Sequence, residues 1–256
     1  MHAADRERTI LSLLGARGFI SFRELDKEVS ASPATLRRDL DRLEAEGRIV
    51  RVHGGAKIPE APSSGLSGVP FHENIQKNTA EKMLIGKAAA ALCFPGESII
   101  IDGGSTTLHM CPHLSELGLH VLTNSLHIVS ALLPQSRTRL SLPAGSLFRE
   151  QSIVLSPFED DGSNHYQASK LFIGAASVGK QGLMQTDIIL LKAEQRLISR
   201  SERVILLVDS SKFRAPEAEI VCDLKAIDTI ITDKNLTDAD ARLIKRAGIE
   251  LIIATK

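Results

Sequence analysis

Three polar loops carry the side chains best suited to binding a small ligand. The first loop reads Asp-Gly-Gly-Ser-Thr-Thr and follows the apolar run Ser98–Ile101. Its glycines let a ligand approach the backbone, and its hydroxyls and the free amides of the next helix suit a phosphate. A tight turn capped by Ser105 explains the same residues equally well, because short glycine-rich loops are weak motifs. The candidate residues are Asp102, Gly103, Gly104, Ser105, Thr106 and Thr107.

The other two loops offer complementary groups. Thr123, Asn124 and Ser125 follow the next apolar run, and their side chains suit sugar hydroxyls or, alternatively, a helix cap. Lys212 follows the apolar run Val204–Val208, where its ammonium group suits a phosphate, although an ordinary polar loop is the alternative. Open α/β sheets bind ligands at the carboxyl ends of their strands, so we expect the three loops to form one site.

Two neighbouring segments are further candidates. His109 lies one helical turn beyond Ser105, and Gln151–Ser156 lines either the pocket or a contact with another subunit. His109 and His113 also flank Cys111, which makes a partial set of zinc ligands. On a helix, however, the cysteine projects away from both histidines, and no fourth ligand lies nearby in the sequence. We therefore expect neither a metal nor another cofactor.

Strand and helix patterns alternate around these loops. Short runs rich in β-branched residues predict strands at 98–102, 120–123, 139–142, 171–175, 204–208, 229–232 and 250–253. Helical patterns lie between many of them, at 79–92, 106–117, 126–133, 188–200 and 238–247. This alternation predicts an α/β fold with a mainly parallel sheet and helices on both faces.

Three helical segments precede residue 58. The second begins at a capping-box sequence, Ser21–Glu24, and the third at Ser32-Pro33, where serine suits the N-cap and proline the first turn. Leucines spaced four and three residues apart form the core stripe of the third helix, which Gly47 ends. A basic strand and a turn follow at 48–55, so the pattern predicts a winged helix-turn-helix. A solvated helical module with ordinary surface arginines is the alternative.

The polar face of the third helix and the wing carry the candidate DNA contacts. Arginines bond guanine edges or phosphates, whereas Asp39 is expected to orient an arginine, because phosphates repel a carboxylate. The net charge gives no support for DNA binding, because the chain has 31 basic and 31 acidic residues, and residues 1–57 have 11 basic and 9 acidic side chains. The prediction therefore rests on where the basic side chains lie. The candidates are Ser32, Thr35, Arg37, Arg38, Arg42, Arg51 and His53.

Composition sets the domain organisation. The 256 residues are 43% hydrophobic and 24% charged, which suits two globular domains. A stretch rich in Pro, Gly and Ser predicts a linker at 58–71 between domains at 1–57 and 72–256. No apolar run approaches the ~20 residues of a membrane span. The charged N-terminus lacks the pattern of a secretory signal and the three cysteines are scattered, so we expect a cytoplasmic protein.

Several of these segments share a resemblance. Ser32–Leu40, which reads Ser-Pro-Ala-Thr-Leu-Arg-Arg-Asp-Leu, closely resembles the recognition-helix signature of the deoxyribose-operon repressor (DeoR) family. Leu43–Gly47 and Val52–Ala56 resemble the helix end and wing of that family. The loop at 102–107 and Asp209–Lys212 together resemble its sensor domain, which is similar in fold to ribose-5-phosphate isomerase. The resemblance spans nearly the whole chain and implies binding of double-stranded operator DNA by a homodimer or homotetramer.

The isomerase comparison raises an enzyme as the rival function. Such an enzyme needs a carboxylate base, and isomerases carry an acid-rich stretch where this chain reads Ile173–Ser177 without any acid. The catalytic glutamate of the isomerases aligns with Gln195, or with Glu194 if the alignment shifts by one residue. We therefore expect a sensor, and not an enzyme. It keeps the phosphate-binding loops and lacks the catalytic groups.

The chain also departs from the common sensor pattern of the family. Many members carry two glycines, an acid and a lysine at the positions of Pro143–Gly145, Ser169-Lys170 and Lys192–Glu194. The phosphate loops are unaffected, so the ligand is expected to differ from common hexose or ketose phosphates. We expect a repressor of a carbohydrate or polyol catabolic operon, released from its operator by a phosphorylated sugar or polyol. No sequence feature speaks against an activator.

Overall fold

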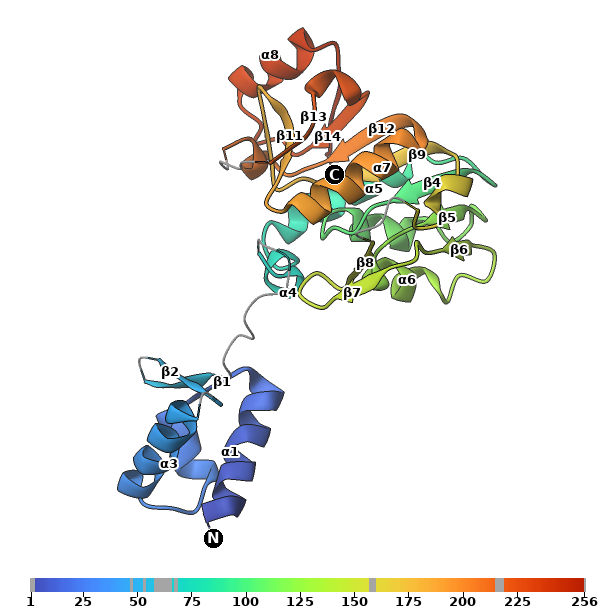
Figure 1. Cartoon of the computed structure of the whole chain (residues 1–256). Coiled ribbons are helices and arrows are strands. Elements are labelled where there is room, and N and C mark those ends of the chain that lie inside the picture. Colours follow the sequence, from blue (N-terminus) through green and yellow to red (C-terminus); the bar gives the residue numbers. More distant parts are fainter. Residues whose placement is uncertain are drawn as a thin grey trace. The chain divides into compact units, whose positions relative to one another are not determined.

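The computed structural model describes residues 3–46, 48–52, 54–57, 66, 69–156, 160–214 and 219–255. The chain divides into two compact units, Met1–Ser64 and Gly65–Lys256 (Figure 1). Within the described ranges, every helix is too short or too polar to cross a lipid bilayer.

The N-terminal unit is a winged helix-turn-helix, as predicted. Its helices are α1 (Ala3–Arg17), α2 (Phe22–Glu28) and α3 (Pro33–Ala45). Its strands β1 (Phe19–Ser21), β2 (Val50–Val52) and β3 (Gly55–Lys57) pair in the antiparallel order β1-β3-β2, and β2 and β3 form the wing. Apolar side chains from all three helices fill the core, including Ile10, Leu14, Leu25, Leu36, Leu40 and Leu43.

Both predicted helix starts in this unit are confirmed. Ser21 Oγ accepts a hydrogen bond from the Glu24 amide at 3.3 Å, and the Glu24 carboxylate accepts one from the Ser21 amide at 2.9 Å. Ser32 Oγ accepts from the Thr35 amide at 3.3 Å and so caps α3. The predicted end of α3 at Gly47 lies outside the described residues. Strand β1 was not predicted, because three residues are too few to show an alternating pattern.

The larger unit is built on a seven-stranded parallel sheet in the order β15-β14-β12-β9-β4-β5-β6. Each strand overlaps a predicted one, which confirms the mainly parallel α/β class. Parallel strands buried on both faces read as continuous apolar runs, which made them visible in the sequence. The strands are β4 (Ser98–Ile101), β5 (His120–Leu122), β6 (Arg139–Ser141), β9 (Ala168–Ile173), β12 (Ser201–Leu207), β14 (Thr229–Thr232) and β15 (Glu250–Ile253).

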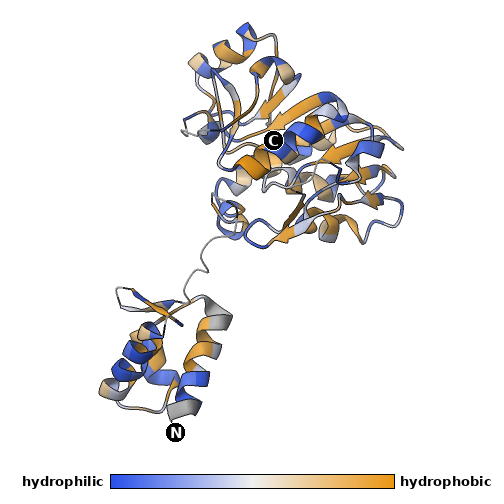
Figure 2. Ribbon diagram, in the orientation of Figure 1, coloured by the Kyte–Doolittle hydropathy of each residue, from blue (hydrophilic) through white to orange (hydrophobic). Residues whose placement is uncertain are grey.

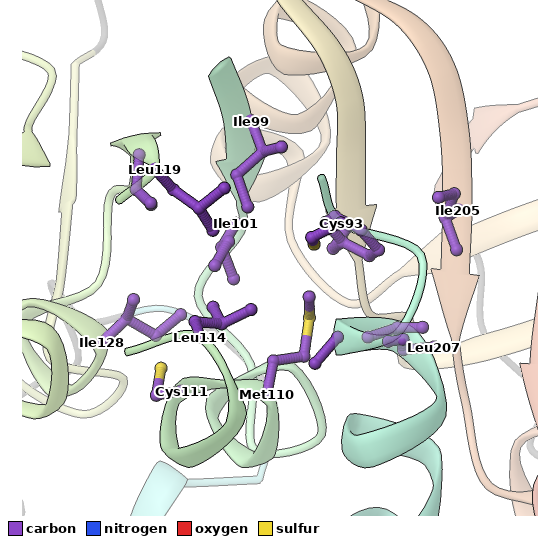
Figure 3. Close-up of a cluster of buried hydrophobic side chains, with 14 of the residues drawn as sticks. Cys93, Ile99, Ile101, Met110, Cys111, Leu114, Leu119, Ile128, Ile205 and Leu207 are labelled. Carbon is purple, nitrogen blue, oxygen red and sulfur yellow. The ribbon is translucent and has the colours of Figure 1, made fainter. Parts of the chain in front are cut away.

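Helices cover both faces of this sheet. On one face pack α5 (Thr79–Ala90), a 3₁₀ helix (Thr107–His113) and α6 (Leu126–Leu132) (Figure 3). On the other face pack α7 (Ile188–Ser199) and α8 (Asp238–Arg246). Successive residues of β4 alternate between the two cores, since Ile99 and Ile101 contact one and Ile100 the other. Figure 2 shows the hydrophobic residues concentrated along the central strands.

The segment predicted as a helix at 106–117 takes a different form. It is a 3₁₀ helix of seven residues with Pro112 inside it. Proline has no amide hydrogen and its ring clashes with the preceding turn, so an α-helix cannot run through this position without a kink. The helical pattern predicted at 106–117 is therefore a shorter helix of 3₁₀ type.

Short elements that the sequence did not reveal complete the unit. They are α4 (Phe71–Asn74), the hairpin of β7 (Ser146–Phe148) and β8 (Ile153–Leu155), and an antiparallel sheet of β10 (Ser177–Gly179), β11 (Gly182–Gln185) and β13 (Glu219–Cys222). Short 3₁₀ turns lie at Ser163–His165, Ser210–Arg214 and Leu224–Ala226. Leu66, inside the predicted linker, packs with Ile153 and Leu155 in this unit.

The strand order changes direction between β4 and β9. From β4 the sheet continues through β5 to β6, and from β9 it continues through β12 and β14 to β15. The loops that leave these two neighbouring strands therefore diverge at their carboxyl ends. Such a switch point leaves a crevice, which is where open α/β sheets bind ligands.

Candidate functional site

A pocket of about 330 Å³ lies at this switch point. One part of its wall follows the parallel strands and consists of Asp102–Thr106, Gly174–Ala176, Leu207, Val208 and Lys212. The rest comes from the start of the unit, the β7–β8 hairpin, and the β11–α7 segment: Val69, Phe71, Asn74, Gln151, Ile153, Gln185, Thr186, Leu190 and Glu194. Two of the three predicted loops thus meet in one cavity.

Asn124 belongs to the remaining predicted loop, at residues 123–125, and holds the glycine loop from outside the pocket. Its Nδ2 donates to Asp102 Oδ1 at 2.9 Å, and its Oδ1 accepts from the Gly103 amide at 2.8 Å. Thr123 and Ser125 are buried beside it and do not line the cavity, and Ser125 caps α6 through the Ile128 amide at 3.3 Å. These three residues therefore support the site without facing its cavity.

Gly103 occupies a position with no room for a side chain. A Cβ atom there would lie 2.6 Å from Ile153 Cγ2 and 3.0 Å from Asn124 Oδ1. Any larger residue would push the glycine loop away from the β7–β8 hairpin. The glycine is thus required for packing as well as for ligand approach.

The glycine loop presents unused donors to the cavity. Ser105 and Thr106 are buried and line it, and within the described chain the amides of Gly104, Ser105 and Thr106 donate no hydrogen bond. Thr107 Oγ1 instead donates to the carbonyls of Asp102 and Gly104, at 2.7 and 2.9 Å, and lies outside the pocket lining. Ser105 makes no cap for the following helix. Free amides and hydroxyls of this kind suit an anion.

Lys212 brings positive charge to the same cavity. It is half-buried in the turn after β12. The Lys212 amide donates to the Asp209 carbonyl at 3.0 Å, and Asp209 Oδ1 accepts hydrogen bonds from Asn78 Nδ2 at 2.8 Å and from the Ser211 amide at 3.1 Å. Asp209 therefore fixes the turn that carries the lysine.

A second lysine lies behind this end of the pocket. Lys82 of α5 is buried and donates to the carbonyl of Asn74, which lines the cavity. Burial lowers the pKa of Lys82 to about 8, with Asp209 raising it and Lys212 lowering it further. The sequence gave no signal for this residue, because a lysine in an amphipathic helix reads as a surface residue.

Two buried acids belong to the pocket wall, and one of them, Glu194, was not among the predicted ligand-binding residues. Asp102 and Glu194 are both buried and both line the cavity. Burial raises the pKa of Asp102, which the bonds from Asn124 and Gly103 oppose, and burial and the charge of Asp102 raise that of Glu194 well above its usual range. Gln195, the residue first aligned with the isomerase glutamate, donates to the Val221 carbonyl at 2.8 Å and lies outside the lining.

The start of the larger unit forms part of the pocket wall. Gln151 Nε2 donates to the Val69 carbonyl at 2.8 Å, and the Phe71 amide donates to the Glu150 carbonyl at 3.0 Å. The Phe71 ring stacks on His127 with 4.0 Å between ring centroids. Within 151–156, only Gln151 and Ile153 line the cavity.

His109 lies outside the pocket lining, where its backbone packs against Gly86 of α5. Its Nε2 is buried without a partner, and burial, with a smaller effect of Lys82, lowers its pKa. Cys111 is buried in the core of the unit. Across the described ranges, no group of three or more His, Cys, Asp or Glu side chains is arranged to hold a metal ion.

In the N-terminal unit, the candidate arginines have different surroundings. Arg38 is exposed and makes no hydrogen bond or ion pair with any described residue. Arg37 is exposed with its guanidinium 5.4 Å from the centre of the Phe22 ring. Thr35 and Ser32 lie at the N-terminus of α3, where Ser32 Oγ and Thr35 Oγ1 are 2.9 Å apart. The first two turns of α3 thus carry two exposed arginines, Arg37 and Arg38, as candidates for DNA contacts.

Two other candidates are held by acidic side chains. Arg42 pairs with Glu7 of α1 at 3.1 Å, and Arg51 of the wing pairs with Asp41. Asp39 does orient an arginine, as predicted, but the main partner is Arg6 of α1 at 2.7 Å. Arg42 therefore joins α1 and α3. His53 lies outside the described residues.

Comparison with known proteins covers both units. Residues 6–61 match the model of the DeoR-like helix-turn-helix domain, and residues 77–234 match that of the DeoR C-terminal sensor domain. The chain is 29% identical to the HTH-type transcriptional regulator UlaR of Shigella dysenteriae over 252 residues, which cover 98% of this chain and 99% of the relative. UlaR of Escherichia coli K12 is also 29% identical, with the same coverage.

Solved structures resemble parts of the chain. Ribose-5-phosphate isomerase A of Methanocaldococcus jannaschii is 18% identical with a TM-score of 0.40, over 54% of this chain and 55% of that one. eIF2B delta of Chaetomium thermophilum is 13% identical with a TM-score of 0.40, over 81% of this chain and 64% of that one.

Proposed function

This chain belongs to the DeoR family of DNA-binding transcriptional regulators, and on that premise we propose that it is a repressor released from its operator by a phosphorylated sugar or polyol. It is not an isomerase, since its N-terminal domain belongs to a DNA-binding family and its full-length relatives are transcriptional regulators. We assign DNA binding to residues 1–57, ligand sensing and oligomerisation to residues 72–256, and the connection to residues 58–71. The regulated genes would serve carbohydrate or polyol catabolism.

One observation carries the proposal of a phosphorylated ligand. The unused amides and hydroxyls of Gly104–Thr106 line the same cavity as Lys212. A phosphate needs several hydrogen-bond donors and a compensating charge, and this cavity provides both. Its 330 Å³ falls in the range of small-molecule sites, roughly 300–1,000 Å³. A sugar or polyol chain would occupy the rest of the cavity, whose wall includes Gln151, Gln185 and Glu194.

The pocket wall also suggests how occupancy changes DNA binding. Val69 and Phe71 line the cavity, and they lie at the end of the connecting segment 58–71. A ligand that contacts them favours one arrangement of this segment. In a homodimer or homotetramer, that arrangement would set the spacing of paired DNA-binding heads. Release requires different ligand affinities in the two arrangements, since equal binding shifts no equilibrium.

A thermal-shift screen tests the proposal. The full chain is heated with D-ribose 5-phosphate, D-glucose 6-phosphate, D-sorbitol 6-phosphate and the corresponding free sugars and polyol. A ligand at a hundredfold excess over its Kd stabilises the native state by about 2.7 kcal/mol. We expect stabilisation by at least one phosphorylated compound and none by its unphosphorylated form. Equal shifts from both forms would contradict the phosphate site. DNA and these metabolites meet in the cytoplasm, which is where we infer that the protein acts.

A further inference from the structure

Glu194 is a buried acid in the wall of the pocket. It lies on the first turns of α7 with its side chain 2% exposed, and it lines the cavity together with Asp102. Lys212 lines the same cavity, and the charges of Lys212 and Asp209 both act on the buried Lys82. The groups that act on Glu194 are Asp102 and Gln185. A ligand whose phosphate contacts Lys212 would share the cavity with the carboxyl group of Glu194.

Among the residues that the structure describes, one carboxyl oxygen of Glu194 has a hydrogen-bond partner and the other has none. Gln185 Nε2 donates to Glu194 Oε1 at 2.5 Å, whereas Oε2 is buried and lacks a partner within the described ranges. At least nine in ten buried polar groups have a partner, because leaving one unsatisfied costs about 1–3 kcal/mol. The pocket is the space that Glu194 shares with a ligand, so the missing partner of Oε2 is expected to come from it.

We propose that Glu194 Oε2 is the contact for a hydroxyl group of the effector, and that Glu194 thereby determines which phosphorylated sugar or polyol binds. The inference rests on the proposed function. It assigns the phosphate to Lys212 and the glycine loop, and the discrimination between compounds to Glu194. The effector class is then a polyhydroxy compound with a phosphate at one end and a hydroxyl within reach of Glu194.

The surroundings of Glu194 set the direction of this hydrogen bond. Asp102 from the end of β4 and the Cys222 thiol of β13 are the titratable groups that interact with it. Burial and the neighbouring carboxyl raise the pKa of Glu194 well above its usual range, which favours the protonated acid. Gln185 already donates to Oε1, which leaves the proton on Oε2. A neutral acid in this position donates to a ligand oxygen, and a hydroxyl can accept that bond.

Two substitutions separate this role from a packing role. Glu194→Gln keeps the shape and replaces the O–H donor by an N–H donor, while its carbonyl oxygen still accepts from Gln185. Glu194→Met keeps the approximate volume and removes both functions. Glu194→Ala replaces the methionine variant if that variant fails to fold. Each variant is titrated calorimetrically as the full chain, with inorganic phosphate and with the sugar and polyol phosphates of the screen.

We expect Glu194→Met to weaken sugar-phosphate or polyol-phosphate binding by about ten- to a hundredfold, the effect of losing one buried hydrogen bond. Glu194→Gln should bind within a few-fold of wild type. Inorganic phosphate should bind both variants as it binds wild type, and Lys212→Ala should weaken every phosphorylated probe.

Three outcomes would overturn the inference. The first is that Glu194→Met binds the sugar phosphates as tightly as wild type. The second is that Glu194→Met loses affinity for inorganic phosphate in equal measure. The third is that Glu194→Gln loses binding as completely as the methionine variant. If wild type binds none of the sugar or polyol phosphates, the proposed function itself fails. If wild type binds them and Glu194→Met does so equally well, only the role of Glu194 fails.

Discussion

Asn124 Nδ2 lies 2.9 Å from Asp102 Oδ1, a hydrogen bond that joins the residues following β5 and β4. The same amide group accepts a hydrogen bond from the Gly103 backbone. The conformation of the glycine loop therefore depends on a side chain that does not line the pocket. Ligand affinity should respond to this residue even though a ligand would not touch it.

Asn124→Ala removes both hydrogen bonds and leaves Asp102 and the Gly103 amide with unsatisfied buried groups. We expect a loss of about 1–3 kcal/mol in the free energy of unfolding and weaker sugar-phosphate binding. Ser125→Ala is the matched control, because it removes the neighbouring cap of α6 and costs about 1 kcal/mol without touching the loop. Denaturant unfolding and calorimetric titration check both variants. Equal ligand affinity in the two variants would show that Asn124 does not hold the loop.

The buried acids predict a pH-dependent stability. The raised pKa values of Asp102 and Glu194 mean that the folded chain holds these protons more tightly than the unfolded chain. Their effect on stability is smallest below the ordinary carboxyl range, and stability falls as pH rises through the raised values. The lowered pKa of Lys82, about 8, acts oppositely at higher pH, where folding gains as pH rises from there toward the ordinary lysine value.

Glu194→Gln removes one of these titrations. At a pH below the ordinary carboxyl range the variant and wild type should unfold with similar free energies. At a pH above the raised pKa of Glu194 the variant should be the more stable, because only wild type loses stability as pH rises between these values. Glu116→Gln, at a side chain that is 90% exposed, is the control and should give the same difference at both pH values. A pH-independent difference for Glu194→Gln would contradict the raised pKa.

Substitutions of Arg38 and Arg42 should have different effects on DNA affinity and on the free energy of unfolding. Arg38 is exposed and unpaired within the described chain, so Arg38→Ala should weaken binding to a selected duplex by about ten- to a hundredfold and leave unfolding unchanged. Arg42 pairs with Glu7, so Arg42→Ala should lower stability and affect DNA less. Fluorescence anisotropy at fixed salt, with denaturant unfolding beside it, distinguishes them. Unchanged affinity of Arg38→Ala would remove Arg38 from the interface.

The stack of Phe71 on His127 offers a test of coupling. His127 is outside the pocket lining, while Phe71 is inside it and follows the connecting segment. His127→Ala should leave DNA affinity without ligand unchanged and raise the ligand concentration needed for half-release by about two- to tenfold, the value of an aromatic pair. His127→Phe keeps a ring in place and should behave as wild type. Identical release curves for alanine and phenylalanine would exclude the stack from the coupling.

Long apolar runs made most of the fold predictable. The seven strands of the parallel sheet and the capped helices α2 and α3 were found because runs rich in β-branched residues, or a serine at an N-cap, leave a local pattern. Most of the antiparallel strands β7, β8, β10, β11 and β13 mix glycine or polar residues with apolar ones, so no continuous apolar run marks them. The helix after the glycine loop was misjudged because Pro112 was not weighed as a helix breaker.

The pocket was only half predictable for a different reason. The glycine loop and Lys212 follow strands, so strand order alone indicates that they lie at one edge. Glu194, Gln185 and Lys82 reach the site through packing of α7, β11 and α5, which no local pattern encodes. The N-terminal arginines show the same limit, since helical periodicity placed Arg42 on the polar face but did not indicate Glu7 of α1 as its partner.

The most direct test of the account combines DNA and ligand in one sample. The full chain is bound to a fluorescent duplex selected from random DNA, and the sugar or polyol phosphate that stabilises it most is added while anisotropy is measured. Wild type should release the duplex as ligand is added. Lys212→Ala should bind the duplex equally well and retain it at ligand concentrations that release wild type. Release of Lys212→Ala at the same concentration as wild type would contradict the sensing site, as would a wild-type complex that no phosphorylated compound dissociates.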